Sequence, residues 1–172
     1  MGTASSLVLT PAMTIDDTFE SFFRRTYARL AQASLLLTGS REEAQDVAQE
    51  ALARAYSRWE RVRTMDSPEG YVYRTALNIV RKGAGRSTPR TEQPSAGHSA
   101  QDPSIDIAER DRVMQALKSL PGGQREVLVM TEWLDLDTRE VARALRIAES
   151  SVRVRLHRAR SNLREALGGN HE

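Results

Sequence analysis

The chain has 172 residues, of which 40% are hydrophobic, 28% charged and only 5% aromatic, and it contains no cysteine. This composition is typical of a soluble globular protein, and it excludes disulfides and cysteine-based zinc sites. The longest apolar runs, such as Leu35-Leu36-Leu37, are far too short to span a bilayer, and residues 1–11 lack the cationic start of a signal peptide. We therefore expect a cytoplasmic protein without membrane insertion.

The charges are distributed unevenly along the chain. The formal net charge is only +2, which is small for a protein that binds DNA tightly by itself. Basic residues gather between residues 81 and 90 and again between 151 and 164, whereas acidic residues gather between 42 and 50. Two basic patches and one acidic patch predict two kinds of partner and weak DNA binding by the isolated chain.

The first half, residues 18–85, is predicted to form three helices. Apolar residues recur at helical spacing from about residue 17 to 38. Ser40 and Glu43 have the spacing of a capping box, which begins a second helix whose apolar stripe ends at Trp59, expected in the core. A Ser-Pro-Glu sequence then starts a third helix that runs towards a glycine near residue 83. The tail that precedes this half, residues 1–17, has no pattern that we can interpret.

Residues 86–106 are predicted to form a flexible linker. This segment contains three prolines and many small polar residues, so it cannot bury enough apolar surface to offset the entropy of ordering. Fully extended, it could reach roughly 70 Å, at about 3.3–3.6 Å per residue. The two halves could therefore bind well-separated targets.

The second half, residues 107–168, is predicted to form four helices. The first ends before Pro121, the second extends to about Leu134, and Asp137 is a candidate N-cap for a short third helix. A longer basic helix begins near Ser150. The last two form a helix-turn-helix candidate. No segment alternates like a strand, so we expect an all-α protein of two small helical domains joined by the linker.

The last helix carries the candidate residues for reading DNA. Its apolar stripe faces one way, and hydroxyl, imidazole and guanidinium groups face the other, where they could reach base edges in the major groove. Arginines nearer the flanks of this face are expected at phosphates. The alternative is a solvated basic face that complements the helix dipole. The candidate residues are Ser150, Ser151, Arg153, Val154, Arg155, His157, Arg158 and Ser161.

Two sets of motifs resemble those of bacterial RNA polymerase sigma factors. Leu120 to Leu128, Arg139 to Ala142 and Ser151 to Arg160 look like the fourth conserved region of that family. Glu43 to Glu50 and Pro68 to Asn78 look like its second conserved region. The order, the linker and the short length are similar to the extracytoplasmic-function class, which keeps only these two domains.

The resemblance implies roles for further residues. The family's acidic helix binds a basic coiled coil of core RNA polymerase, which implies a polymerase-binding set of Glu43, Asp46, Gln49 and Glu50. The resemblance of the third helix to the family's promoter-melting segment implies that it contacts the melted minus-ten element. The residues concerned are Tyr71, Tyr73, Arg74, Asn78, Arg81 and Lys82. Exposed bases stack on aromatic rings, and loop 64–70 would form the wall of a base pocket. The alternatives are that the first acids only complement a helix dipole and that either tyrosine is an ordinary core residue.

The chain departs from the family pattern at three positions of the second half. Arg146 stands where a turn glycine is usual, Ala148 where a serine N-cap is usual, and Val154 where a polar residue is usual. Arg146 would be mildly strained in the left-handed conformation that such a turn requires, and Ala148 has no side-chain oxygen with which to cap the last helix. Val154 could contact a thymine methyl group but cannot donate a hydrogen bond. These changes bear on the promoter sequence more than on the fold.

The resemblance implies a sigma factor that binds core polymerase and promoter DNA and starts transcription of a stress- or signal-responsive set of genes. An anti-sigma partner is implied by family analogy alone. A one-component regulator with a sensor in the first half is the alternative, and its first half should offer a ligand cavity. An enzyme is the weakest hypothesis, because the three histidines lack metal-ligand spacing and no nucleophile or phosphate loop is present. We expect no catalytic residue, no metal and no cofactor.

Overall fold

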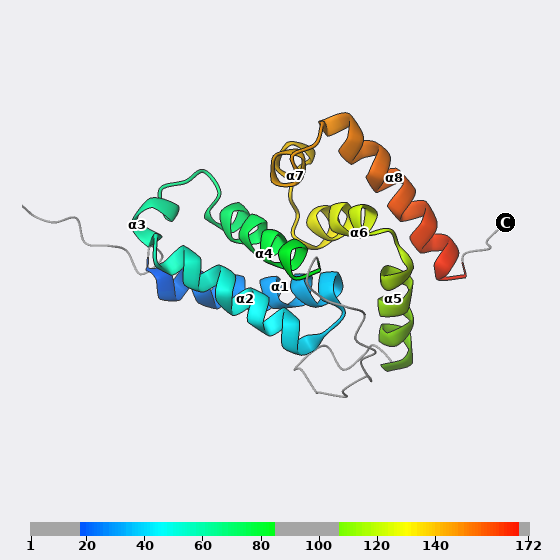
Figure 1. Ribbon diagram of the computed structural model, residues 1–172, viewed down its shortest axis with the longest axis horizontal. Helices are drawn as coiled ribbons and strands as arrows, with labels where there is room; N and C mark the ends of the chain where they lie inside the picture. Colours follow the sequence, from blue (N-terminus) through cyan, green and yellow to red (C-terminus); the bar gives the residue numbers. More distant parts are fainter. Residues whose placement is uncertain (1–17, 85–106, 169–172) are drawn as a thin grey trace, which may run out of the picture.

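The regular structure of the protein is entirely helical over the residues that the structure, a computed structural model, describes, which are 18–84 and 107–168 (Figure 1). This confirms the expected all-α fold class. The N-terminal tail and the predicted linker fall outside these ranges. The helices of the first half are α1 (Phe19–Thr38), α2 (Arg41–Tyr56), α3 (Trp59–Val62) and α4 (Pro68–Ala84).

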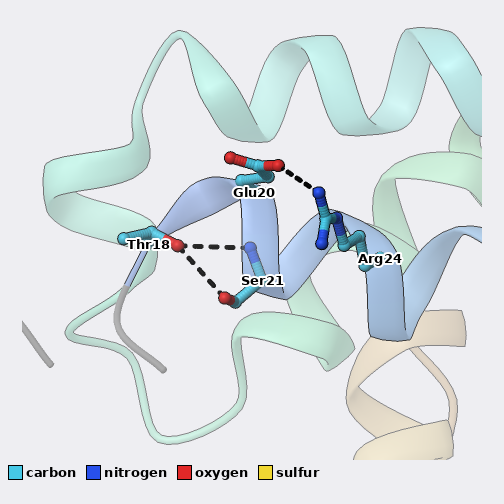
Figure 2. A network of polar contacts seen from close by, with 4 residues as sticks. All are labelled: Thr18, Glu20, Ser21 and Arg24. Carbon is cyan, nitrogen blue, oxygen red and sulfur yellow. Dashed lines mark hydrogen bonds and ion pairs between the residues drawn. The ribbon is translucent and has the colours of Figure 1, made fainter. Parts of the chain in front are cut away.

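Side-chain caps define the starts of α1 and α2. The Thr18 hydroxyl accepts a hydrogen bond from the Ser21 N–H (3.2 Å), and an Arg24–Glu20 ion pair of 2.5 Å follows on the same turn (Figure 2). The Ser40 hydroxyl accepts the Glu43 N–H at 3.4 Å, which is one half of the predicted capping box. These bonds satisfy amide groups that have no partner within a helix. Both helix starts therefore follow from local sequence.

Small residues allow α1 and α2 to pack closely. The buried face of α2 is mostly alanine, and large side chains come from the helices around it. Trp59 lies against the rings of Phe19 and Phe22, with centroids 5.3 and 5.0 Å apart, as expected of a core residue. The one-turn helix α3, which we did not predict, brings Val62 into this core at 0% exposure. The polar face of α2 is thereby left to solvent.

The second half is a chain of short helices that ends in a long one. It contains α5 (Ile107–Ser119), α6 (Gly122–Leu128), a π-helical turn η2 (Val129–Trp133), α7 (Thr138–Leu145) and α8 (Glu149–Ala166). We predicted one helix where α6 and η2 lie. In η2 the Leu134 N–H donates to Val129 O, five residues back, at 3.2 Å.

The helix-turn-helix forms as predicted. Asp137 makes a complete capping box with Glu140, with hydrogen bonds of 2.7 and 2.9 Å. Arg146 ends α7 in the left-handed conformation, with φ 56°, and α8 then starts at Ala148 without a side-chain cap. The turn positions α8 across α6 and α7, with Val152 buried in the first turn of α8.

The two halves lie against each other. Figure 1 shows α5 and α6 beside the end of α1, with α7 beyond α4. The π-helical turn η2 contacts α1 and buries Val129 and Met130. The described residues thus share one continuous apolar core.

We expect Arg146→Gly to stabilise the protein by up to about 1 kcal/mol. Glycine adopts a positive φ without steric cost, whereas an L-residue there is strained, and part of the gain is offset by the entropy that glycine loses. Arg146 is exposed, with no side-chain bond to any described residue, so nothing else is lost. Urea unfolding monitored by circular dichroism measures the change.

Arg143→Gly is the matched control for that substitution. Arg143 is exposed inside α7, where glycine costs about 1 kcal/mol. The two substitutions remove the same side chain but should shift the unfolding midpoint in opposite directions. Destabilisation of similar size by both would show that Arg146 is not strained.

Candidate nucleic-acid and polymerase interfaces

The outer face of α8 presents most of the candidate DNA-reading side chains to solvent. Packing of Val152 and Ala159 into the core turns the opposite side of the helix outward. The exposed members of the set are Ser150, Arg153, Val154, His157, Arg158 and Ser161. Val154 is 51% exposed, an unusual position for a large apolar side chain in a solvated helix face. An exposed apolar residue among polar ones suits contact with a thymine methyl group.

Ion pairs separate the arginines of α8 into two groups. Arg160 is held by the Glu132 carboxylate, with Nε at 2.9 Å, and Arg153 lies 3.8 Å from Glu149. Arg158 makes no hydrogen bond or ion pair with any residue that the structure describes. Arg158 is therefore the guanidinium of this face most available to a partner.

Two candidates on α8 are only half-exposed. Ser151 lies at the edge of the buried face, and the Arg155 guanidinium lies against the start of α6. A Cβ added at Gly123 would approach Nη1 of Arg155 to 3.1 Å. The Arg155 guanidinium thus lies where α8 packs on α6, and it is less available to DNA than the exposed members of the set.

The candidate face of α4 holds five of its six predicted residues. At 100° per residue, Tyr71, Asn78 and Lys82 lie within about 40° of one another, and Arg74 and Arg81 lie along one edge of the same face. Asn78 and Lys82 are exposed, and Tyr71 is half-buried against the core. An aromatic ring beside an amide and cations suits a splayed base with its phosphates.

Tyr73 is not on this face, and the expectation that it contacts DNA does not hold in the structure. It lies about 200° around the helix from Tyr71 and is 5% exposed. Burial raises the pKa of its phenol; the charge of Arg29 lowers this pKa, and the charges of Glu69 and Asp135 raise it. The ordinary core alternative is the correct one for Tyr73.

The arginine edge of α4 faces the second half. Arg81 donates to both carboxylate oxygens of Glu126, at 2.8 and 2.6 Å, and this hydrogen bonding raises the pKa of Arg81. Arg74 lines a cleft of about 350 Å³. One wall of the cleft is formed by residues 64–67 and by Gly70 of α4, in the segment that we predicted as the wall of a base pocket, and the other is α7 with Glu140 and Arg143. Sequence patterns gave no signal for Glu126, because its partner is 45 residues away.

The acidic candidates lie together on the solvent side of α2. Glu43, Asp46, Gln49 and Glu50 are all exposed, because the alanine face opposite them is buried. Glu50 pairs with Arg54 at 2.7 Å, whereas Asp46 makes no hydrogen bond or ion pair with a described residue. The Glu43 side chain does not complete the capping box. Its carboxylate therefore remains available for a basic partner.

Residues 18–84 and 107–168 offer neither a metal-binding cluster nor a membrane-spanning helix. No group of three or more histidine, aspartate or glutamate residues there is arranged to hold a metal ion. Among the helices described, none combines the length and the apolar character needed to cross a bilayer.

Comparison with known families matches both halves. Residues 22–87 match the family described as Sigma-70 region 2, and residues 110–163 match Sigma-70, region 4. An RNA polymerase sigma-E factor of Streptomyces coelicolor is 33% identical over 153 residues, which cover 87% of this chain and 85% of that protein. The ECF RNA polymerase sigma factor SigM of Mycobacterium tuberculosis is 28% identical over 156 residues, which cover 87% of this chain and 77% of that protein.

Solved structures share the fold. The sigma factor RpoE in complex with the anti-sigma factor NepR, from Bartonella quintana, superposes with a TM-score of 0.77 at 20% identity, covering 91% of this chain and 100% of that one. CnrH in complex with the cytosolic domain of CnrY gives a TM-score of 0.62 at 23% identity, covering 89% of each chain. With both regions matched in this order and a relative 33% identical over most of both chains, the protein belongs to the sigma-70 family of RNA polymerase sigma factors, in its extracytoplasmic-function class.

Proposed function

We propose that this sigma factor, which serves promoter-specific initiation of transcription, divides its work among three faces. The outer face of α8 reads the minus-thirty-five element in the major groove. The Tyr71–Asn78–Lys82 face of α4, with Arg74 and Arg81 along its edge, binds the melted minus-ten element. The acidic face of α2, which includes Gln49, docks on core RNA polymerase. The observation that carries the proposal is that these three faces are solvent-exposed on helices whose other sides are buried.

Phosphoryl transfer belongs to the polymerase in this proposal, and the chain supplies positioning and strand opening without a catalytic residue or cofactor. It would act where core polymerase is, in the cytoplasm. An anti-sigma partner is supported by the two solved relatives, RpoE and CnrH, which are described in complex with the anti-sigma factor NepR and with the cytosolic domain of CnrY. We infer that the controlled genes respond to stress or another signal.

Transcription with purified core polymerase tests the function as a whole. The chain, added to core enzyme, should direct initiation at a small set of promoters that are identified by mapping transcripts after overexpression. A regulator of another class cannot replace the sigma subunit, so initiation by core enzyme without this chain, at the same sites, would contradict the proposal.

The α2 face can be tested by reversing one charge. Asp46→Lys should weaken binding to core polymerase about tenfold or more, equivalent to about 1.4 kcal/mol, because a like charge meets the basic partner surface. Asp111→Lys, an exposed acid of α5 with no bond to a described residue, is the matched control with the same change in net charge. Fluorescence anisotropy of the labelled chain measures both. Equal weakening by the two would assign the effect to net charge alone.

Arg158→Ala tests the reading face of α8. The substitution should weaken the free energy of binding to the preferred minus-thirty-five sequence by about 1–3 kcal/mol, because a bidentate contact to one base is lost. It should also relax the sequence preference at that one base pair. Arg164→Ala, near the end of the helix, should instead weaken binding to all promoters alike. It should also reduce the slope of log binding constant against log salt concentration by about one. Holoenzyme binding to promoter variants at several salt concentrations gives both values. A uniform loss for Arg158→Ala would refute its role in base reading.

A further inference from the structure

The turn between α7 and α8 contains a residue whose backbone conformation is unfavourable for its type. Arg146 has φ 56° and ψ 47°, in the left-handed region. Two backbone bonds close the turn there, because the N–H groups of Arg146 and Ile147 both donate to Ala142 O. Glycine would make the same bonds without the steric strain that an L-residue meets. The fold therefore requires the backbone at this position and not the arginine side chain.

The Arg146 guanidinium is not used by the fold. The residue is exposed, and its side chain makes no hydrogen bond or ion pair with any residue in the ranges 18–84 and 107–168. The nearest acids along the chain are already engaged. Glu140 completes the capping box of α7, and the Glu149 carboxylate lies 3.7 Å from Arg139 and 3.8 Å from Arg153. A strained residue whose side chain has no internal partner indicates a use outside the folded chain.

The surroundings of Arg146 are strongly basic. Residues 141–160 contain six arginines and a single acid, Glu149. We call Arg139, Arg146 and Arg153 the turn patch; all three are exposed, and Glu149 brings the first and the last to the same side of the turn. Like charges at this density repel one another in the free chain, and a polyanion relieves that repulsion. The turn patch therefore favours a nucleic-acid backbone as its partner over an isolated carboxylate.

The place of the turn in the motif favours a phosphate over a base. In a helix-turn-helix the first residues of the second helix contact base edges, and the first helix crosses the DNA backbone. Arg146 lies between the two, four residues before Ser150 of the outer face of α8. A guanidinium at this point lies beside the groove and not within it. Its fork of N–H donors suits two phosphate oxygens, and such a contact carries no base preference.

We infer that Arg146 binds a backbone phosphate of the DNA that α8 reads, and that the turn is less stable than it could be because it holds this side chain. The inference rests on the function proposed above, since it takes the outer face of α8 as the promoter-reading surface. Arg146 raises the affinity for every promoter alike, whereas Arg158 sets the preference among promoters. Stability and DNA binding are therefore opposed at this one residue.

Three substitutions separate the charge of Arg146 from its strain. Arg146→Gln removes the charge and keeps a side chain at positive φ, Arg146→Lys keeps the charge, and Arg146→Gly removes both. One phosphate contact contributes a slope of about 0.9 to log affinity against log salt concentration, which corresponds to about fivefold between roughly 1 M and 0.15 M salt. Holoenzyme with Arg146→Gln or Arg146→Gly should therefore bind all promoter variants about fivefold more weakly at about 0.15 M salt, with the slope reduced by about 0.9. Arg146→Lys should keep most of the affinity, because an ammonium still meets the phosphate.

Arg110→Gln is the matched control with the same change in charge. Arg110 is exposed on α5, which Figure 1 shows away from the turn between α7 and α8. It should leave both the affinity and the salt slope unchanged. Equal losses for Arg110→Gln and Arg146→Gln would overturn the inference, because net charge alone would explain them. A loss for Arg146→Gln that is confined to some promoter variants would also overturn it, because that pattern belongs to a base contact.

Urea unfolding of the same variants adds a readout that a purely structural residue would not give. Arg146→Gly should raise the unfolding midpoint while it lowers the affinity for DNA, and Arg146→Gln should lower the affinity at a nearly unchanged midpoint. Opposite changes in stability and binding are typical of a strained residue that serves function. For a residue that only supports the fold, both quantities would change in the same direction. A more stable Arg146→Gly chain that binds promoters as tightly as the original would overturn the inference.

Two further measurements keep this inference distinct from the proposed function. Arg146→Gln should bind core polymerase without DNA as tightly as the original chain does; weaker binding would mean that the turn patch meets an acidic protein surface, and the inference would be wrong. Arg158→Ala reports on base reading by α8. If it affects no promoter while Arg146→Gln lowers affinity and salt slope, the phosphate contact stands and the proposed reading face is wrong. If Arg158→Ala relaxes the preference and Arg146→Gln changes nothing, the reading face stands and this inference fails.

Discussion

The Arg125 guanidinium satisfies carbonyl groups at the ends of two helices that belong to different halves of the chain. Leu37 O lies in the last turn of α1, and Lys118 O lies in the last turn of α5. The last carbonyls of a helix have no partner within it, and the helix dipole makes that end attractive to a cation. One side chain thereby fixes where α1 and α5 end relative to each other. In the same interface η2 contacts α1, and Glu126, the residue after Arg125, contacts Arg81.

Core composition explains why the first half can present two functional faces at once. Because α2 contributes mostly alanine to the core, it approaches α1 closely and needs only a narrow buried stripe. The rest of its circumference stays in water, where Glu43, Asp46 and Glu50 are exposed. On α4 the buried side carries larger residues, including Tyr73 and Leu77, which orient the opposite face outward. The same packing that stabilises the half thus determines which side chains can meet a partner.

Local signals in the sequence predicted most of the helices but could not predict how the halves meet. The Asp137 N-cap, the left-handed Arg146 and the uncapped start at Ala148 all depend on neighbouring residues, and all were predicted; the reciprocal bond from Glu140 that completes a capping box was not. The one-turn α3 and the π-helical η2 depend on tertiary packing, so no local pattern indicated them. Tyr73 was assigned to DNA from its place in a family motif, although helical periodicity puts it on the buried side. Arg81–Glu126 joins residues 45 positions apart, which no periodicity reveals.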